Sequence, residues 1–275
     1  MNGHKGPLGF LYAGVASGVR VKRPDLALLF CEVDAVAAGC FTRSRARAAA
    51  VDRSPSLVPS VRIRAVVVNS GNANALTGPE GAEADRRMAE AIARALGVSN
   101  EAVLTCSTGI MGVPLPVAKI EAATPALVER LGPEVEPFAE AIHTTDRVQK
   151  IASRELFVGG DCVRVLGVAK GSGMVHPNLG TVLAFLLTDA VITPDTLDTL
   201  LRWAVDGSFH LLSVDGDSST NDTALALASG LAENEPITSA DSPSGQVLGA
   251  ALLAVAQDLA RAVAADGEGA RHLIT

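Results

Sequence analysis

The stretch that decides the fold runs from residue 170 to residue 190 and reads KGSGMVHPNLGTVLAFLLTDA. A glycine-rich turn leads into an apolar segment of strand length, and the pair Gly180-Thr181 stands at the junction. A threonine at the head of a strand can attack the carbonyl of the small residue before it. Cleavage then exposes an amine beside the threonine hydroxyl, so one residue supplies both a nucleophile and its general base.

The same turn has two other interpretations. In the first it is a plain tight loop. In the second it cradles a phosphate, but Gly171-Ser172-Gly173 follows Lys170 and leads into a strand, whereas dinucleotide-binding and Walker-type loops open a helix. A phosphate-binding loop is therefore disfavoured.

The composition describes a globular chain with a large core. Of its 275 residues, 48% are apolar and 19% are charged, which excludes disordered, coiled-coil and collagen-like chains. The formal net charge is −7 and only 3% of the residues are aromatic. A nucleic-acid partner is not expected, because it needs a basic face or a platform of stacked rings.

The cysteines and the longest uncharged stretches bear on the cellular compartment. Cys31, Cys40, Cys106 and Cys162 are far apart and form no CxxC pair, so we expect four buried small apolar residues and a reducing, cytoplasmic setting. The N-terminus lacks a basic start followed by an apolar block, and the long uncharged stretches are broken by Gly, Pro, Asn or Ser. We therefore predict no secretory signal and no membrane helix.

Periodicity predicts strands that alternate with helices. The expected strands cover residues 27–33, 65–69, 163–168 and 181–188. The expected helices cover residues 82–96, 194–206 and 245–265, and a surface loop is expected over residues 233–245. This alternation fits a sandwich of sheets and helices as well as a doubly wound sheet.

Two further turns have more Gly, Asn, Ser and Thr than a simple connection needs. They cover residues 69–74, NSGNAN, and residues 106–112, CSTGIMG. Six or more such motifs, in this order, closely resemble the bifunctional ornithine acetyltransferase family, the glutamate N-acetyltransferases of arginine biosynthesis. The motifs are the segments 9–15, 66–74, 107–109, 144–146, 170–190, 214–223 and 266–270.

The resemblance implies an α/β fold, an α-β-β-α sandwich similar to that of the self-processing aminopeptidases. Residues 1–275 would form a single ornithine acetyltransferase-like domain, cleaved between Gly180 and Thr181, with the family's C-terminal part absent. Gly180 stands where the family commonly has alanine, and Leu179 where it has methionine. The added flexibility of glycine is expected to slow self-cleavage.

The resemblance also assigns roles to residues. Thr181 would be the nucleophile, acetylated in a ping-pong cycle, and Thr108 with the amide of Gly109 would form the oxyanion hole. The residues that would contact the substrate are Thr144, Lys170, Thr181 and Glu268. A lysine and a glutamate suit the carboxylate and the ammonium of an amino acid. No metal or prosthetic group is implied.

The implied activity moves an acetyl group from N-acetylornithine to glutamate, with acetyl-CoA as a possible second donor. Hydrolysis by an amidase or peptidase of the same nucleophile class remains an alternative, and so does a non-catalytic binding protein or an inactive truncated relative. The expected partners are these small molecules and other copies of the cleaved α and β chains in an oligomer, with no nucleic acid and no membrane.

Some polar residues near the motifs have simpler interpretations. Thr145 is expected to be a helix-start or turn residue. His176 is expected to be a structural hydrogen-bonding residue, because the freed threonine amine already serves as base. Asp215, Asp217 and Asp222 suggest a cation site at first sight. Spaced among Ser and Thr in a turn, they are expected to accept backbone hydrogen bonds instead.

Overall fold

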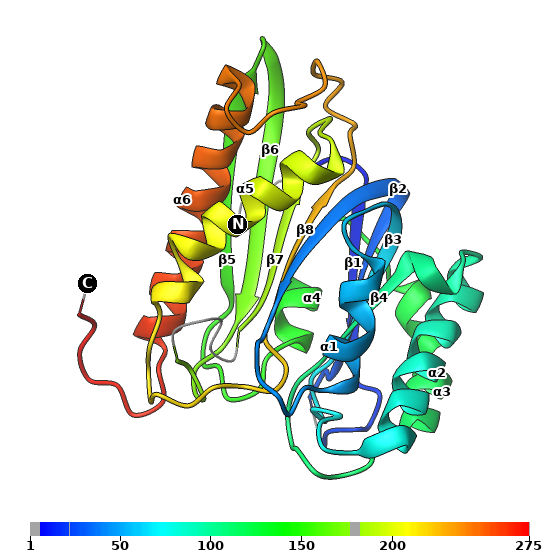
Figure 1. Cartoon of the computed structure of the whole chain (residues 1–275). Helices are drawn as coiled ribbons and strands as arrows, with labels where there is room; N and C mark the ends of the chain where they lie inside the picture. Colours follow the sequence, from blue (N-terminus) through cyan, green and yellow to red (C-terminus); the bar gives the residue numbers. More distant parts are fainter. Residues whose placement is uncertain (1–5, 22, 177–181, 275) are drawn as a thin grey trace.

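The computed structural model describes residues 6–21, 23–176 and 182–274 (Figure 1). The strands are β1 (Phe10–Val15), β2 (Leu26–Phe41), β3 (Ser60–Asn69), β4 (Val103–Ser107), β5 (Lys150–Val158), β6 (Asp161–Lys170), β7 (Leu183–Thr188) and β8 (Thr223–Ala228). The α-helices are α1 (Ala49–Arg53), α2 (Gly78–Leu96), α3 (Val117–Glu129), α4 (Glu136–Ala141), α5 (Pro194–Asp206) and α6 (Pro243–Ala265). The described residues also form the short 3₁₀ helices η1 (Ser54–Leu57), η2 (Asn100–Ala102) and η3 (Phe209–Leu211).

The strands of the described chain form one hydrogen-bonded sheet in the order β4-β3-β2-β8-β7-β6-β5, and β1 also pairs with β2. The pairs β3–β4 and β7–β8 are parallel, and the remaining pairs are antiparallel. The 16-residue strand β2 joins the two halves of the sheet. Its first part pairs with β1 and β3, and its last six residues pair with β8.

The side chains of β2 show how the halves are layered. Successive side chains of a strand point to opposite faces. Ala27, Leu29 and Ala37 belong to a central core that also takes side chains from β3, β4, β6, β7, β8 and α4. In the intervening positions Leu28 packs toward α2 and α3, whereas Ala38 packs toward α5 and α6. The two β layers therefore share a core and carry helices outside, which confirms the expected α-β-β-α arrangement.

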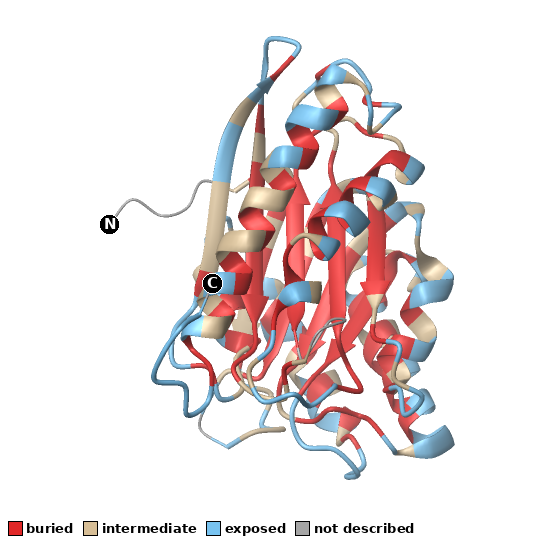
Figure 2. Ribbon diagram, turned by 60° about the vertical axis from the view of Figure 1, so that its left-hand side comes forward, coloured by how far each residue is buried: buried red, intermediate tan, exposed pale blue. Residues whose placement is uncertain are grey.

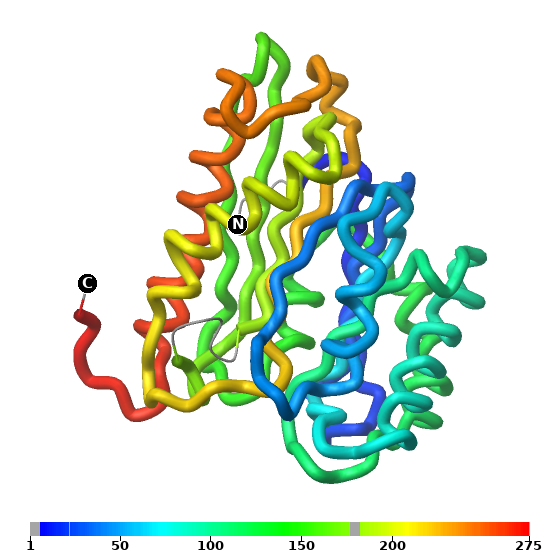
Figure 3. Tube along the Cα trace, viewed as in Figure 1, coloured from blue at the N-terminus to red at the C-terminus, as the bar shows by residue number. Residues whose placement is uncertain are grey.

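The views of the whole molecule agree with this layering. In Figure 1 α5 and α6 cover the half that contains β5 to β8, and α2 and α3 flank the half that contains β1 to β4. Figure 2 shows that the strands are mostly buried, while the helices carry exposed residues on their outer sides. The trace in Figure 3 shows the C-terminal helix α6 alongside strands from the middle of the sequence.

The predicted elements are present, but several are longer than their apolar patterns. Strand β2 continues from the predicted end at residue 33 to Phe41, because Glu32 and Asp34 interrupt the pattern while the backbone stays extended. Strand β3 begins at Ser60, since Arg62 and Arg64 alternate with its buried positions. Helix α2 begins at Gly78 and α6 at Pro243, four and two residues before their predicted starts.

Helix α6 bears on the prediction that the chain has no membrane helix. The helix has 23 residues, and an 18-residue window within it has a mean hydropathy of 1.6, so by length and composition it would suffice to cross a membrane. In this structure its buried residues Leu248, Leu252, Val255 and Leu259 pack in the core with β5, β6 and α5. The apolar composition of the helix is thus explained by its place in the fold.

The cysteines are buried at three of the four positions. Burial raises the pKa of the Cys31 thiol to about 11 and that of Cys40 to about 11, and Cys106 is also buried. Cys162 is exposed, so the prediction for this residue is wrong. It lies at the start of β6 beside the β5–β6 turn, where the hairpin extends into solvent.

Candidate active site

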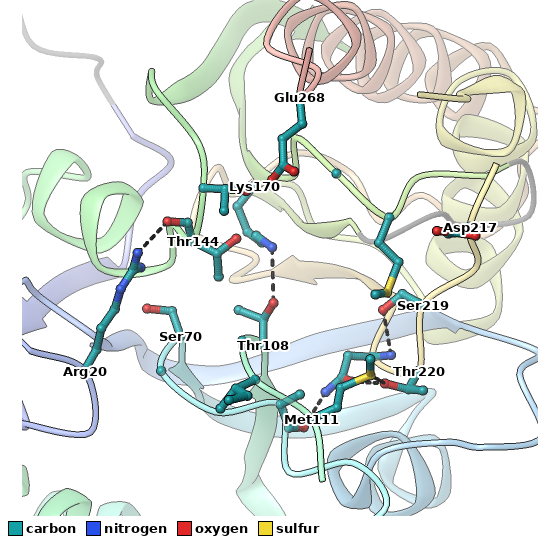
Figure 4. A pocket seen from close by; sticks show the side chains of 18 of the residues that line it. Arg20, Ser70, Thr108, Met111, Thr144, Lys170, Asp217, Ser219, Thr220 and Glu268 are labelled. Carbon is teal, nitrogen blue, oxygen red and sulfur yellow. Dashed lines mark hydrogen bonds between the residues drawn. The ribbon is translucent and has the colours of Figure 1, made fainter. Parts of the chain in front are cut away.

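The glycine-rich turns meet around one cavity of about 530 Å³ (Figure 4). It brings together five of the residues proposed from the sequence, namely Thr108, Gly109, Thr144, Lys170 and Glu268. The rest of its described lining comprises Arg20, Ser70, Gly71, Ala73, Ile110, Met111, Thr145, Gly173, Met174, Asp215, Asp217, Ser219, Thr220 and Asn221. The cavity therefore lies where the turns after β3, β4 and β6 approach the segment before β8.

Asn69 joins the turns after β3 and β4 to each other. Asn69 ends β3, and its Oδ1 accepts the amides of Gly71 and Asn72, both at 3.1 Å. Its Nδ2 donates to Oγ of Ser107 at 3.0 Å, and its carbonyl accepts the amide of Thr108 at 2.8 Å. The conformation of the Asn-rich turn thus sets the position of Thr108 at the end of β4.

Lys170 and Thr108 form the centre of the site. Lys170 is the last residue of β6 and is only 2% exposed. Its Nζ donates to Oγ1 of Thr108 at 3.1 Å, as Figure 4 shows. An ammonium group can only donate, so the threonine hydroxyl keeps its own hydrogen for another acceptor. Burial lowers the pKa of Lys170, and the carboxylates of Asp146 and Asp222 oppose that effect.

Gly109 offers a second donor beside this hydroxyl. Its φ of +129° is unfavourable for residues with a side chain, and a Cβ would lie 2.8 Å from the amide nitrogen of Asn72. Its own amide has no acceptor among the described residues. The hydroxyl of Thr108 and the amide of Gly109 are therefore two neighbouring donors at the cavity wall, the arrangement that an oxyanion requires.

The opposite wall is built around Thr144 and Arg20. The guanidinium of Arg20 donates to the carbonyls of His143 at 3.0 Å and Thr144 at 2.7 Å. Thr145, expected as a helix-start or turn residue, lies in the cavity wall, and its Oγ1 is 2.6 Å from Oγ of Ser172. Arg20 is not among the residues predicted from the sequence, and no local pattern marks it, because its partners are more than 120 positions away in the sequence.

Glu268 approaches from the segment after α6. Its amide donates to the carbonyl of Ser172 at 2.7 Å. A Cβ on Gly173 would lie 2.8 to 3.0 Å from the carboxylate group of Glu268, so a side chain there would displace that carboxylate from its present position. Glu268 and Lys170 thus place opposite charges on one cavity, as a zwitterionic ligand would need.

The proposed cleavage residues Gly180 and Thr181 lie outside the described residues. The next residue in the chain, Val182, is buried, and its amide donates to Oδ1 of Asp222 at 3.2 Å. Oδ2 of Asp222 is buried and has no partner in the described part of the chain. Burial raises the pKa of Asp222 to about 8.

Asp215, in the same turn, binds the backbone through its carboxylate. The carboxylate of Asp215 accepts the amides of Met174, Val175 and Asp217, which confirms the hydrogen-bonding interpretation for Asp215. Among the described residues no group of three or more His, Cys, Asp or Glu side chains has the arrangement of a metal site. The expectation for His176 is not met at Nδ1, which is buried without a partner in the described ranges.

Known proteins match this chain along its length. The ArgJ family model matches residues 11–275. The arginine biosynthesis bifunctional proteins ArgJ of Thermotoga neapolitana and Thermus thermophilus are 46% and 47% identical over 271 and 270 residues. Each match covers 98% of this chain and 68% and 67% of the relative, respectively. The chain therefore spans about two-thirds of the length of these relatives.

Solved structures agree in fold. The ArgJ protein of Bacillus halodurans is 37% identical with a TM-score of 0.58, and the match covers 62% of this chain and 91% of that chain. Ornithine acetyltransferase from Mycobacterium tuberculosis, solved in complex with ornithine, is 34% identical with a TM-score of 0.56 and coverages of 66% and 96%. A β-aminopeptidase from Burkholderia shares the fold at 14% identity, with a TM-score of 0.60 and coverages of 97% and 89%. The motifs around the cavity, the layered fold and these matches together show that the chain belongs to the ArgJ family.

Proposed function

We propose that this chain transfers an acetyl group from N-acetylornithine to glutamate through an acetylated Thr181. The observation that carries the proposal is the cavity that combines the donors of Thr108 and Gly109 with Lys170, Thr144 and Glu268. Family membership supports the reaction class, and the M. tuberculosis relative was solved with ornithine.

The first half-reaction acetylates the enzyme. After cleavage of the bond between Gly180 and Thr181, the threonine hydroxyl attacks the acetyl carbonyl carbon, and its proton passes to the threonine amine. The carbonyl oxygen becomes an oxyanion, which accepts from the hydroxyl of Thr108 and the amide of Gly109. Lys170 holds that hydroxyl by donating to its oxygen. The amide C–N bond then breaks, and ornithine leaves with the proton.

The second half-reaction reverses these steps with a new amine. The amino group of glutamate attacks the ester carbon of acetyl-Thr181, the C–O bond breaks, and the threonine hydroxyl regains its proton. Both amino acids carry an α-carboxylate, which Lys170 is suited to bind. Glu268 faces the same cavity and is suited to an ammonium group. One pocket thus serves donor and acceptor in turn, as a ping-pong cycle requires.

The finer properties belong to the same proposal. Acetyl-CoA is proposed as a second acetyl donor, and the enzyme is proposed to act in the cytoplasm as an oligomer of cleaved α and β chains. Support for association comes from the edge strand β5, where Phe157 is 72% exposed. Light scattering of the purified protein tests association, and a monodisperse monomer would contradict it.

The decisive experiment supplies N-acetylornithine with and without glutamate. We expect N-acetylglutamate to form and ornithine to be released over many turnovers only when glutamate is present, because without an acceptor the reaction stops after one ornithine per active site, at the acetyl-enzyme. Ornithine released at the same rate without glutamate would identify a hydrolase, because water would then attack the acetyl-enzyme. No release in either mixture would identify an inactive relative and would overturn the proposal.

A further inference from the structure

A buried ionic cluster lies outside the cavity lining and contacts the segments that carry the substrate residues. Lys150, at the start of β5, has a fully buried side chain. Its Nζ donates to Oδ1 of Asp146 at 2.7 Å and to Oδ2 of Asp266 at 2.8 Å. Both carboxylates are buried as well, with side chains 0% and 4% exposed. None of the three residues lines the large cavity.

The carboxylate of Asp146 fixes two substrate segments at once. Oδ2 accepts the amide of Thr144 at 3.1 Å, and Oδ1 accepts the amide of Gly171 at 2.7 Å. Gly171 directly follows Lys170, so one side chain sets the backbone on both sides of the pocket. Burial alone would raise the pKa of Asp146, but Lys170, Lys150 and these hydrogen bonds hold it well below its ordinary value.

The third segment is fixed through Asp266. This residue caps the end of α6, two positions before Glu268, and its carboxylate also accepts the amide and the Nε of Arg147 at 2.9 and 3.0 Å. The cluster therefore joins the segment at 144–147, the end of β6 and the end of α6. These three segments supply Thr144, Lys170 and Glu268.

We propose that Asp146, Lys150 and Asp266 are positioning residues that set the geometry of the amino-acid pocket. The inference rests on the proposed function, because it assigns Thr144, Lys170 and Glu268 to substrate binding. A buried ion pair is weak evidence for stability, since desolvation of its charges offsets their attraction. Three charges that are buried and fully hydrogen-bonded behind a pocket are better explained by the geometry they impose.

The chain offers a matched control for Asp146. Asp189 is also buried, accepts two backbone amides, from Leu8 at 3.1 Å and Arg164 at 2.7 Å, and faces a cation, Arg164. It follows β7, at the opposite end of that strand from Val182. Asp189→Asn therefore removes a comparable buried carboxylate at a place remote from the pocket.

The test compares steady-state kinetics of the wild-type, Asp146→Asn and Asp189→Asn proteins. Misplacing groups that contact substrate by about 1 Å lowers rates by about a hundredfold. We expect Asp146→Asn to lower kcat/KM by about that factor, mainly through a higher KM for N-acetylornithine and glutamate. Asp189→Asn is expected to lower thermal stability and leave both KM values unchanged.

A second pair of variants keeps the proposal testable if Asp146→Asn does not fold. Lys150→Arg retains the charge and at least two donors, whereas Lys150→Met removes both. A KM that rises in Lys150→Met and returns toward the wild-type value in Lys150→Arg supports positioning. Equal KM values in all cluster variants, with activity lost only in proportion to unfolded protein, would overturn it.

The rise of KM at alkaline pH gives an independent test of the positioning role of Asp146. Lys170 faces the carboxylates of Asp146, Asp222 and Glu268 and the cation of Lys150. Loss of the Asp146 charge removes one of the groups that keep Lys170 protonated, so the alkaline rise in KM is expected to move to lower pH in Asp146→Asn only. An inactive wild-type protein would refute the proposed function instead, so the two failures are distinguishable.

Discussion

Asp222→Asn is expected to stabilise the protein increasingly as the pH rises from 5 to 7. Burial raises the pKa of Asp222 from 3.8 to about 8. Between these values the folded state binds a proton that the unfolded chain has released. The free energy of unfolding therefore falls as pH rises, by about 1.4 kcal/mol per pH unit. Asparagine has no proton to lose, and its Oδ1 can still accept the amide of Val182.

The magnitude follows from the same pKa values. From pH 5 to pH 7 the wild-type protein is expected to lose about 3 kcal/mol relative to the variant. Urea denaturation followed by circular dichroism at both pH values measures this difference. At each pH, the free energy of unfolding of the wild-type protein is subtracted from that of the variant. Any effect of the asparagine amide that does not depend on pH cancels when the difference at pH 5 is compared with the difference at pH 7.

Asp215→Asn, in the same turn, is the control, because its effect on the free energy of unfolding is expected to depend differently on pH. Burial opposes ionisation of Asp215, but the amides of Met174 and Val175 outweigh it and lower its pKa. Its contribution to stability is present above the unfolded value and lost only as pH falls through the folded value. Asp215→Asn should therefore destabilise the protein equally at pH 5 and pH 7. Wild-type and Asp222→Asn curves that stay parallel over this range would refute the reasoning for Asp222.

Three further predictions concern the catalytic groups. Intact mass should show chains of residues 1–180 and 181–275, and Thr181→Ala should leave one chain; a wild-type chain that stays intact would contradict self-cleavage. Thr108→Val removes one oxyanion donor and should lower turnover about a hundredfold to a thousandfold, whereas Thr124→Val, which removes a buried hydroxyl bonded to Ile120 in α3, should not. Gly173→Ala should displace Glu268 and raise KM for the amino acids, whereas Gly132→Ala, where a Cβ meets open space, should leave KM unchanged.

The sequence predicts the elements better than it predicts their arrangement. Apolar periodicity locates α2 and α5, because each buries one face, and a continuous apolar run locates β7, which is buried throughout. The same pattern predicts a β2 that is too short, because Glu32 and Asp34 interrupt the apolar residues where the strand passes from one layer to the other. Alternating strands and helices fit two architectures, and only the family resemblance favours the sandwich.

For the candidate site, too, the sequence predicts individual residues better than the contacts between them. Thr108, Gly109 and Lys170 lie in motifs that the sequence displays, and the structure brings them together. Sequence reasoning did not identify Arg20, because its partners are distant in the chain, or Lys150, because one of its two carboxylate partners, Asp266, is 116 positions away. Such contacts leave no local period. Asp146 lies in the motif at 144–146, but its role depends on the positions of the amides of Thr144 and Gly171 and of Lys150.

The site depends on contact between the two β layers. Thr108 directly follows a strand of one layer, whereas Lys170 ends a strand of the other, and their hydrogen bond spans the boundary. Asn221, which lies directly before Asp222 and β8, makes a second link across this boundary. Its Nδ2 donates to the carbonyls of Ala73 at 2.6 Å and Ser107 at 2.8 Å. The proposed oxyanion donors therefore belong to one layer, and the strand that follows Thr181 belongs to the other. Their relative position is set by the shared apolar core, so a volume change at Phe185 should alter acetyl transfer without touching any group in the cavity.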